Sequence, residues 1–190
     1  MITRRRFIAS SGLSLIATRQ VLAAKARFML GIGTYTYRGV TIDQMIERLN
    51  ALKIRHIELS TPEFMLGRLK PEEIPGLKAK FDRAGIQVVS YYCGTIRTNE
   101  ELDKTVRAAQ GLAARNVSGA AMGEMLKTID TRFQREKLTF GIHNHWFRDR
   151  KFEYQSVDDF RKALSGLSGT VGVTLDTGHM ASCGYDPVEA

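Results

Sequence analysis

From residue 28 onward, short apolar runs alternate with longer stretches in which apolar residues recur at helical spacing. The runs predict six β-strands, at Phe28–Thr34, Ile54–Ser60, Ile86–Tyr92, Val117–Ala121, Leu138–His143 and Val171–Asp176. A strand followed by a helix, repeated along a chain, produces a parallel sheet. No linker or change of composition interrupts the alternation, so the pattern predicts one α/β domain over residues 27–190.

Start signals mark several of the intervening helices. Thr41 with Gln44, and Thr98 with Glu101, have the spacing of a capping box, in which two side chains satisfy the first free backbone N–H groups of a helix. Ser156 is suited to cap a further helix. These signals predict that a helix begins directly after each capping residue.

The last two predicted strands each have a bulky face and a small face. Large apolar residues alternate with small or polar ones in both, and successive side chains of a strand point to opposite faces. This arrangement suits a sheet that curls tightly and carries helices on its outside. It favours a (β/α)8 TIM barrel, whose active site lies at the C-terminal ends of the strands, here at His143 and Asp176. A doubly wound sheet is the alternative, although no glycine-rich phosphate loop follows the first strand.

A full barrel of this kind has eight strand–helix units in about 250 residues. Residues 27–190 supply about six units. Asp186-Pro187 has the composition of a helix start, with Asp at the N-cap and Pro at the first helical position, and the sequence stops at Ala190. We therefore expect a barrel without its last two units.

Composition and charge narrow the class of protein. Of the 190 residues, 43% are hydrophobic and 25% are charged, which excludes a disordered tail. Four arginines and no acid lie in the first 24 residues, so the net charge of +8 falls to +4 for the rest, with 24 basic and 20 acidic residues. An excess this small is typical of a solvated surface, and we expect no nucleic-acid partner.

Residues 1–26 have the features of an export signal. Arg4, Arg5 and Arg6 precede a weakly apolar stretch, Ile8–Ala24, beyond which small residues form an A-x-A-like end. The paired arginines with the following x-Phe-Ile resemble the twin-arginine signal, so the expected partner is the twin-arginine export machinery. We expect a periplasmic protein with no stable membrane association after export. A basic helix that belongs to the fold is the alternative.

Two motifs at predicted strand ends carry the candidate chemistry. His143-Asn144-His145-Trp146 ends the fifth strand, and Asp176-Thr177-Gly178-His179 ends the sixth, with a glycine turn before its histidine. Adjacent strand tips place His143 and Asp176 at one rim, on the order of 3–5 Å apart if they share an ion. Such a pair suits a divalent metal, Mn²⁺, Co²⁺ or Zn²⁺ rather than Mg²⁺. A hydrogen-bonded structural histidine is the alternative.

The strand order and these motifs resemble the sugar phosphate isomerase/epimerase superfamily, the xylose isomerase-like TIM barrels. The resemblance implies that Asp176 binds a divalent metal and that His179 contacts the substrate and takes part in catalysis. The fifth-strand element of the family is usually Glu-Asn-His, so His143 stands where the family has a Glu that is both metal ligand and acid/base. The family's other two ligands, on strands seven and eight, lie beyond Ala190.

Further substrate contacts are expected at the same rim. His145 follows the fifth strand, and Glu58 lies near the end of the second. Tyr37 and Trp146 follow strands one and five and could stack on a sugar ring. The alternative for Glu58 is a hydrogen bond at the rim. The alternative for the two aromatic residues is packing against neighbouring side chains.

The resemblance implies proton transfer between adjacent carbons of a small carbohydrate or polyol by an isomerase or epimerase, with lyase chemistry also open. A non-catalytic, degenerate sugar-binding barrel is the alternative, because His143 replaces a Glu and two ligands are absent. An endonuclease of the apurinic-site type shares the barrel, but its zinc cluster needs histidines on the early strands, and the third predicted strand ends without one.

Overall fold

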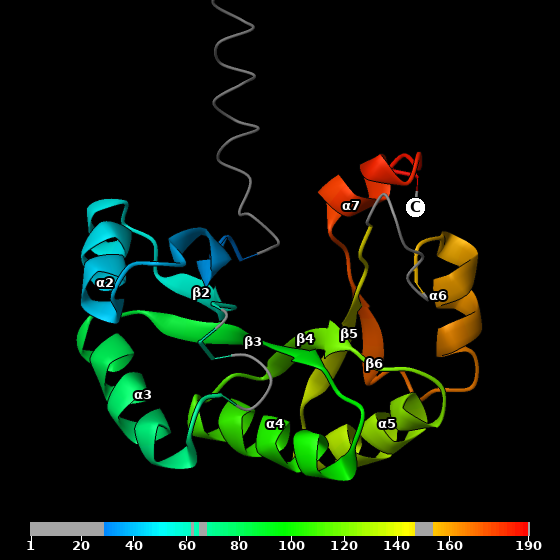
Figure 1. Ribbon diagram of the computed structural model, residues 1–190, viewed down its shortest axis with the longest axis horizontal. Helices are drawn as coiled ribbons and strands as arrows, with labels where there is room; N and C mark the ends of the chain where they lie inside the picture. Colours follow the sequence, from blue (N-terminus) through cyan, green and yellow to red (C-terminus); the bar gives the residue numbers. More distant parts are fainter. Residues whose placement is uncertain (1–28, 62, 65–67, 147–153, 190) are drawn as a thin grey trace, which may run out of the picture. The chain divides into compact units, whose positions relative to one another are not determined.

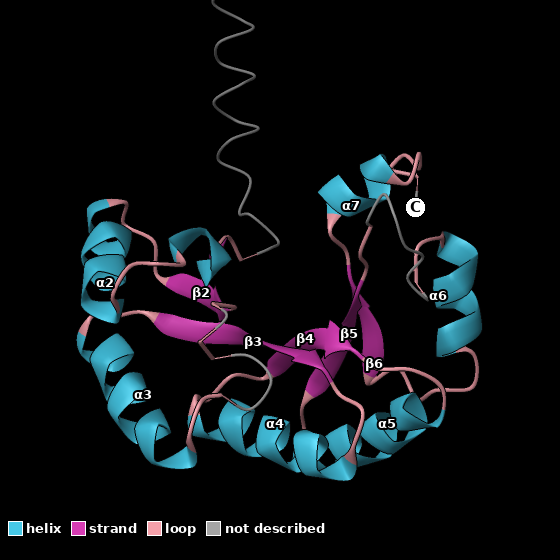
Figure 2. Cartoon of the chain, viewed as in Figure 1, coloured by secondary structure: helices cyan, strands magenta, loops and turns pink. Residues whose placement is uncertain are grey.

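Six strands form one parallel sheet in which each strand pairs with the next one in the sequence (Figure 2). This computed structural model describes residues 29–61, 63–64, 68–146 and 154–189. The predicted export signal, residues 1–26, lies outside them. The strands are β1 (Ile32–Gly33), β2 (His56–Leu59), β3 (Gln87–Thr95), β4 (Asn116–Ala120), β5 (Thr139–His143) and β6 (Val171–Thr174).

All six predicted strands are confirmed, and the largest difference in length is at β1. That strand has only two residues, because the chain turns into a 3-10 helix, η1 (Thr34–Tyr37), directly after Gly33. Phe28, the expected start of this strand, lies outside the described residues. At the other end of the sheet, β6 stops two residues before Asp176, which belongs to the helix that follows.

Helices α2 to α6 lie in an arc along the outer face of the sheet (Figure 1). A sheet that keeps the order of the sequence and carries its helices outside is the wall of a TIM barrel. In a doubly wound fold the strand order reverses at a switch point and helices cover both faces, so the structure excludes that alternative. The helices are α2 (Ile42–Ala51), η2 (Pro71–Glu73), α3 (Ile74–Arg83), α4 (Asn99–Gly111), α5 (Glu124–Glu136), α6 (Val157–Leu164) and α7 (Thr177–Ser182).

The predicted caps begin the helices as expected. Thr41, Thr98 and Ser156 each accept a hydrogen bond from the backbone N–H three residues later, and the side chain of that later residue accepts one from the backbone N–H of the cap. These reciprocal bonds satisfy N–H groups that would otherwise lack a partner at the helix N-terminus. The start of α2, α4 and α6 is therefore encoded locally.

The hydrophobic core lies between the helices and the outer face of the sheet. Phe140 and Ile142 of β5 are 1% and 0% exposed, and they belong to the same core as Phe133 of α5. Val173 and Leu175, at the end of the sixth strand, are each 41% exposed, contrary to the bulky, helix-covered face predicted there. The reason is that β6 is an edge strand of the described sheet, so neighbours bury it from one side only.

Two further properties concern the described residues as a set. Within these ranges, no helix combines the length and the apolar character that crossing a membrane requires. Cys93 and Cys183 are both free. Burial raises the pKa of the Cys93 thiol to about 12, so this side chain behaves as a small apolar residue of the core.

Candidate active site

β5 and β6 bring His143 and Asp176 to the same rim of the sheet. His143 pairs with Thr174 in the ladder, and Asp176 follows Thr174 by two residues, so both side chains leave the same face. Nε2 of His143 lies 3.9 Å from Oδ2 of Asp176. The predicted proximity of the two side chains is confirmed, while their chemical roles stay predictions.

Asp176 is also the N-cap of α7. Its Oδ1 accepts a hydrogen bond from the backbone N–H of His179 at 2.8 Å, and its Oδ2 lies 3.9 Å from Nε2 of His179. The glycine turn expected between these two residues is therefore wrong, because residues 177–182 form a helix that Asp176 caps. One carboxylate consequently faces the imidazoles of both His143 and His179.

His145 completes a cluster of three imidazoles. Its ring centroid lies 4.6 Å from that of His143 and 5.4 Å from that of His179. Oη of Tyr92, on β3, is 3.2 Å from Nε2 of His145, and the Tyr92 ring meets the His143 ring edge-on. From the sequence, Tyr92 was only one of several aromatic residues at strand ends that could stack on a sugar or pack, and nothing in the sequence indicated its hydrogen bond with His145.

Burial shifts the pKa values of His143 and Tyr92 at this rim. It lowers the pKa of His143, whose side chain is 16% exposed, by more than the Asp176 carboxylate raises it. His143 is therefore neutral at pH 7 and has a lone pair for a metal ion or a proton. Burial, with smaller contributions from Cys93, Glu58 and Tyr35, raises the pKa of Tyr92 to about 12. The Tyr92 phenol thus keeps its proton and is a donor to a neighbouring acceptor.

The carboxylate of Glu58, on β2, forms hydrogen bonds to side chains of β3 and β4. Its Oε2 accepts hydrogen bonds from Oγ of Ser90 on β3 at 2.8 Å and from Oγ of Ser118 on β4 at 2.6 Å. This network is a rim hydrogen bond of the kind that was left open as an alternative. A substrate contact at Glu58, which stays a prediction, would have to use the other carboxylate oxygen.

The two predicted aromatic contacts differ in their surroundings. Tyr37 is 7% exposed and packs in the hydrophobic core, which is the packing role that was left open for it. Tyr35 is the more accessible tyrosine of this segment, 49% exposed, with the Arg38 guanidinium 4.7 Å from its ring centroid. Trp146 is half-buried. Substrate binding by Tyr37 and Trp146 stays a prediction.

The His143–Asp176 pair fits part of a metal coordination shell. Two atoms that bind one ion at about 2.0–2.2 Å lie no more than about 4.4 Å apart, and the 3.9 Å between His143 and Asp176 meets this condition. In the part of the chain that the structure describes, no group of three or more His, Cys, Asp or Glu side chains is arranged to hold a metal. The described residues thus bring together two side chains with metal-binding groups, and metal binding itself stays a prediction.

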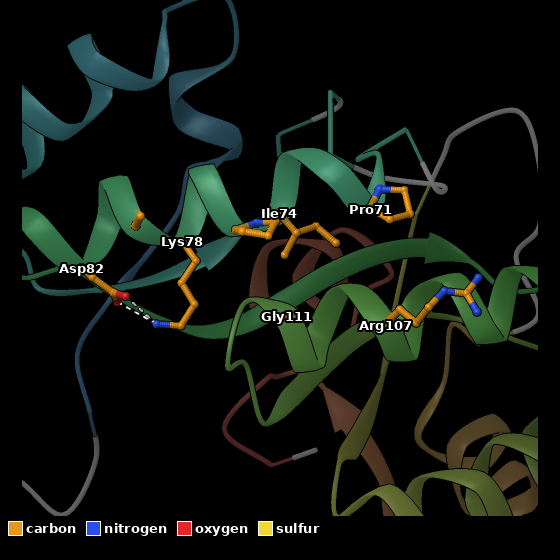
Figure 3. Close-up of a pocket in the computed structure, with 8 residues that line it drawn as sticks. Pro71, Ile74, Lys78, Asp82, Arg107 and Gly111 are labelled. Carbon is orange, nitrogen blue, oxygen red and sulfur yellow. Dashed lines mark hydrogen bonds and ion pairs between the residues drawn. The ribbon is translucent and has the colours of Figure 1, made fainter.

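A surface groove of about 510 Å³ lies away from this rim, between α3 and α4 (Figure 3). Lys78 and Asp82 form an ion pair along α3 at 2.6 Å. Gly111 faces Ile74, where a Cβ would come within 2.6 Å of Cγ2 of Ile74, so the glycine permits the close approach of the two helices. No predicted site residue lines this groove, and we interpret it as a product of helix packing.

The sequence matches no protein-family model, and no curated protein matches it. Solved structures do match. An uncharacterised protein from Parabacteroides distasonis is 24% identical with a TM-score of 0.67, over 84% of this chain and 67% of that one. AsbF from Bacillus anthracis, described as a "probable 3-DHS dehydratase", is 12% identical with a TM-score of 0.64, over 85% and 68%. A D-psicose 3-epimerase from Clostridium cellulolyticum, solved with D-tagatose, is 15% identical with a TM-score of 0.60, over 80% and 65%.

Xylose isomerase domain proteins are among the other similar structures. At these identities the likeness concerns the fold, which is the xylose isomerase-like TIM barrel with six strand–helix units in the described residues. The chain spans between 60% and 68% of the length of these similar structures.

Proposed function

We propose that the rim formed by β5 and β6 is the active site of a metal-dependent isomerase or epimerase that acts on a small carbohydrate or polyol. The observation that carries the proposal is the single carboxylate of Asp176 facing the imidazoles of His143 and His179, each at 3.9 Å. The fold adds support, because an epimerase solved with a ketose shares it. The proposed reaction removes a proton from a carbon beside a carbonyl group and returns it either to the adjacent carbon, in an isomerase, or to the opposite face of the same carbon, in an epimerase.

His143 and Asp176 would hold the ion, and a ligand pair that includes imidazole suits Mn²⁺, Co²⁺ or Zn²⁺ better than Mg²⁺. When bound, such an ion polarises a carbonyl group and a neighbouring hydroxyl group of the substrate. Nε2 of His143 faces Asp176, so this nitrogen cannot bind an ion and accept a proton at the same time. His143 is therefore a base only while no ion occupies that nitrogen.

His179 is the proposed proton acceptor when His143 serves as a ligand. Its side chain is 31% exposed, against 16% for His143, so a substrate at the rim can reach it. The N–H of its backbone is held by Asp176, which fixes the first turn of α7 and the direction in which the imidazole leaves it. An imidazole held in this way is a general base that can accept a carbon-bound proton and return it.

The remaining polar groups suit a polyol. Oη of Tyr92 and the imidazole of His145 form a hydrogen-bonded pair beside His143, and either group can exchange its partner for a sugar hydroxyl. Glu58 offers a carboxylate on the same side of the sheet, and Trp146 a ring for stacking. Substrate binding at these residues is part of the proposal.

A degenerate sugar-binding barrel is the second candidate. Two observations favour it: a histidine stands at position 143, and the described residues contain no group of three metal ligands. Dehydratase chemistry, which the name of AsbF indicates for that protein, begins with the same abstraction of a proton. It remains open for this chain.

Solvent isotope exchange tests the proposal. The full-length protein is incubated in D₂O with a ketose such as D-tagatose and Mn²⁺, Co²⁺ or Zn²⁺, and NMR follows deuterium incorporation beside the carbonyl. We expect metal-dependent incorporation that Asp176→Asn lowers by about 10²-fold or more, while Asp82→Asn, on the outer helix α3, leaves it unchanged. Sugar binding without exchange would favour the second candidate, and exchange that Asp176→Asn does not alter would overturn the proposal.

A further inference from the structure

Asn144 joins the tips of β5 and β6. It directly follows His143 and is 1% exposed. Its Oδ1 accepts a hydrogen bond from the backbone N–H of Asp176 at 2.7 Å, and its Nδ2 donates one to the backbone carbonyl of Asp176 at 3.0 Å. The last pair of the backbone ladder is His143 with Thr174, so the side-chain amide adds one more rung beyond the end of the sheet.

These two hydrogen bonds, with those described next, restrict the backbone and the side chain of Asp176. The carbonyl of Asp176 also accepts a hydrogen bond from the backbone N–H of Met180 at 3.0 Å, within α7. Its Oδ1 is taken by the backbone N–H of His179. The atom that remains is Oδ2, and it faces Nε2 of both His143 and His179.

A primary amide is the side-chain group that matches this position. It presents a donor and an acceptor side by side, as the backbone of Asp176 requires, whereas a carboxylate would set an acceptor against the carbonyl and an aliphatic side chain would offer neither. Breaking a buried pair of this kind leaves an N–H and a carbonyl without their partner, which costs free energy. This cost favours the hydrogen-bonded geometry of the Asn144 amide over other conformations.

We propose that Asn144 is a positioning residue that sets the separation between His143 and Asp176 without touching the substrate. It acts through the backbone of Asp176 on one side and through its covalent link to His143 on the other. The consequence for metal binding rests on the function proposed above. The positional effect rests on the two hydrogen bonds alone.

The chain offers a matched control at the opposite end of the sheet. Asn116, at the start of β4, also bridges strands with its amide: Nδ2 donates to the carbonyl of Val89 at 3.0 Å, and Oδ1 accepts from Oγ1 of Thr139 at 2.7 Å. Asn116→Leu, like Asn144→Leu, removes one donated and one accepted hydrogen bond, although Asn116 is exposed and its donor partner is a hydroxyl group instead of a backbone N–H. It does so away from the three imidazoles.

The test is ¹⁵N–¹H NMR of the histidine side chains in the metal-free full chain, with single His→Gln variants for assignment. Asn144→Leu and Asn144→Ala are expected to displace the imidazole signals of His143 and His179, while Asn116→Leu leaves them at their wild-type positions. If Asn144→Leu does not fold, Asn144→Ala decides, because its smaller side chain leaves room for a water molecule beside the Asp176 amide. Unchanged signals in the folded Asn144 variant, or equal displacement in Asn116→Leu, would overturn the proposal.

A second measurement addresses the metal. Titration with Co²⁺ alone should give an affinity at least about tenfold weaker for Asn144→Ala than for wild type, the usual loss for a residue that supports a metal ligand. Asn116→Leu should bind Co²⁺ as wild type does. Wild-type affinity in Asn144→Ala overturns the metal consequence. A wild-type chain that binds no Co²⁺ counts against the proposed function, and the NMR result still decides the role of Asn144.

Discussion

Nε2 of His143 lies 3.9 Å from Oδ2 of Asp176, across the tips of two neighbouring parallel strands. The sheet keeps the order of the sequence, so these strands are adjacent and end at the same rim. Burial lowers the pKa of His143 although a carboxylate is near. A neutral imidazole therefore lies beside a carboxyl oxygen, a combination suited to binding a cation and to proton transfer.

The stability of the metal-free protein should fall as the pH drops below about 6.5, the ordinary pKa of histidine. The pKa of His143 is lower in the folded than in the unfolded state, so in this range the unfolded chain binds more protons. Stability consequently rises with pH up to about 6.5 and is lost toward the lower, folded-state pKa. Urea unfolding at pH 5, 6, 7 and 8 measures the effect.

His143→Gln is the control for this pH dependence. Removing the imidazole should flatten the change in unfolding free energy between pH 5 and 7. A pH dependence that His143→Gln does not alter would show that other groups produce it.

Glu58→Leu should destabilise the fold by about 1–3 kcal/mol, because Ser90 and Ser118 each lose their hydrogen-bond acceptor. Glu58→Gln should cost less, since its amide oxygen can accept both hydroxyl groups. Thermal unfolding measures the difference. A Glu58→Gln variant that is as stable as wild type but loses ketose binding would assign Glu58 to the substrate, whereas a variant that keeps both would make its role structural.

Gly119→Ala should destabilise the protein by about 1–3 kcal/mol or more through overpacking. A Cβ at this position on β4 would overlap the carbonyl oxygen of Gly94 and come within 2.7 Å of Sγ of Cys93. Gly172→Ala, on β6, is the matched control, because nothing lies within 4 Å of its Cβ position. Chemical denaturation should separate the two variants, and equal stability would contradict the packing described for β3 and β4.

The sequence predicts the repeating parts of this structure well, because they depend on local patterns. Apolar runs locate all six strands, and the Thr41 and Thr98 capping boxes locate two helix starts. The proximity of His143 and Asp176 follows from the order of the strands alone. Each of these features is determined either by one short segment of the sequence or by two segments that follow one another in the sheet.

The features that the sequence did not predict depend on contacts between distant residues. The hydrogen bond of Tyr92 with His145 requires the segment after β5 to fold toward β3, and no spacing encodes that. The serine partners of Glu58 likewise come from two other strands. Helix α7 has only six residues, so one cap at Asp176 decides its existence, and the Gly178 that follows indicated a turn instead.

Export by the twin-arginine route stays a prediction for residues 1–26. Replacing both Arg4 and Arg5 by Lys should leave the precursor in the cytoplasm, because that route reads the arginine pair. Cell fractionation followed by immunoblotting measures the periplasmic fraction. An unchanged periplasmic yield would contradict twin-arginine export, and Arg19→Lys, outside the motif, serves as the control.

The central claim is that His143 and Asp176 bind one divalent ion together, and a Co²⁺ double-mutant cycle tests it most directly. Calorimetric titration of the wild type, His143→Ala, Asp176→Ala and the double variant gives four affinities. We predict one Co²⁺ per wild-type chain, a loss of at least about tenfold in each single variant, and little further loss in the double variant, because either substitution already removes the shared site. Single variants that bind Co²⁺ as tightly as wild type, or losses that simply add, would contradict a shared ion.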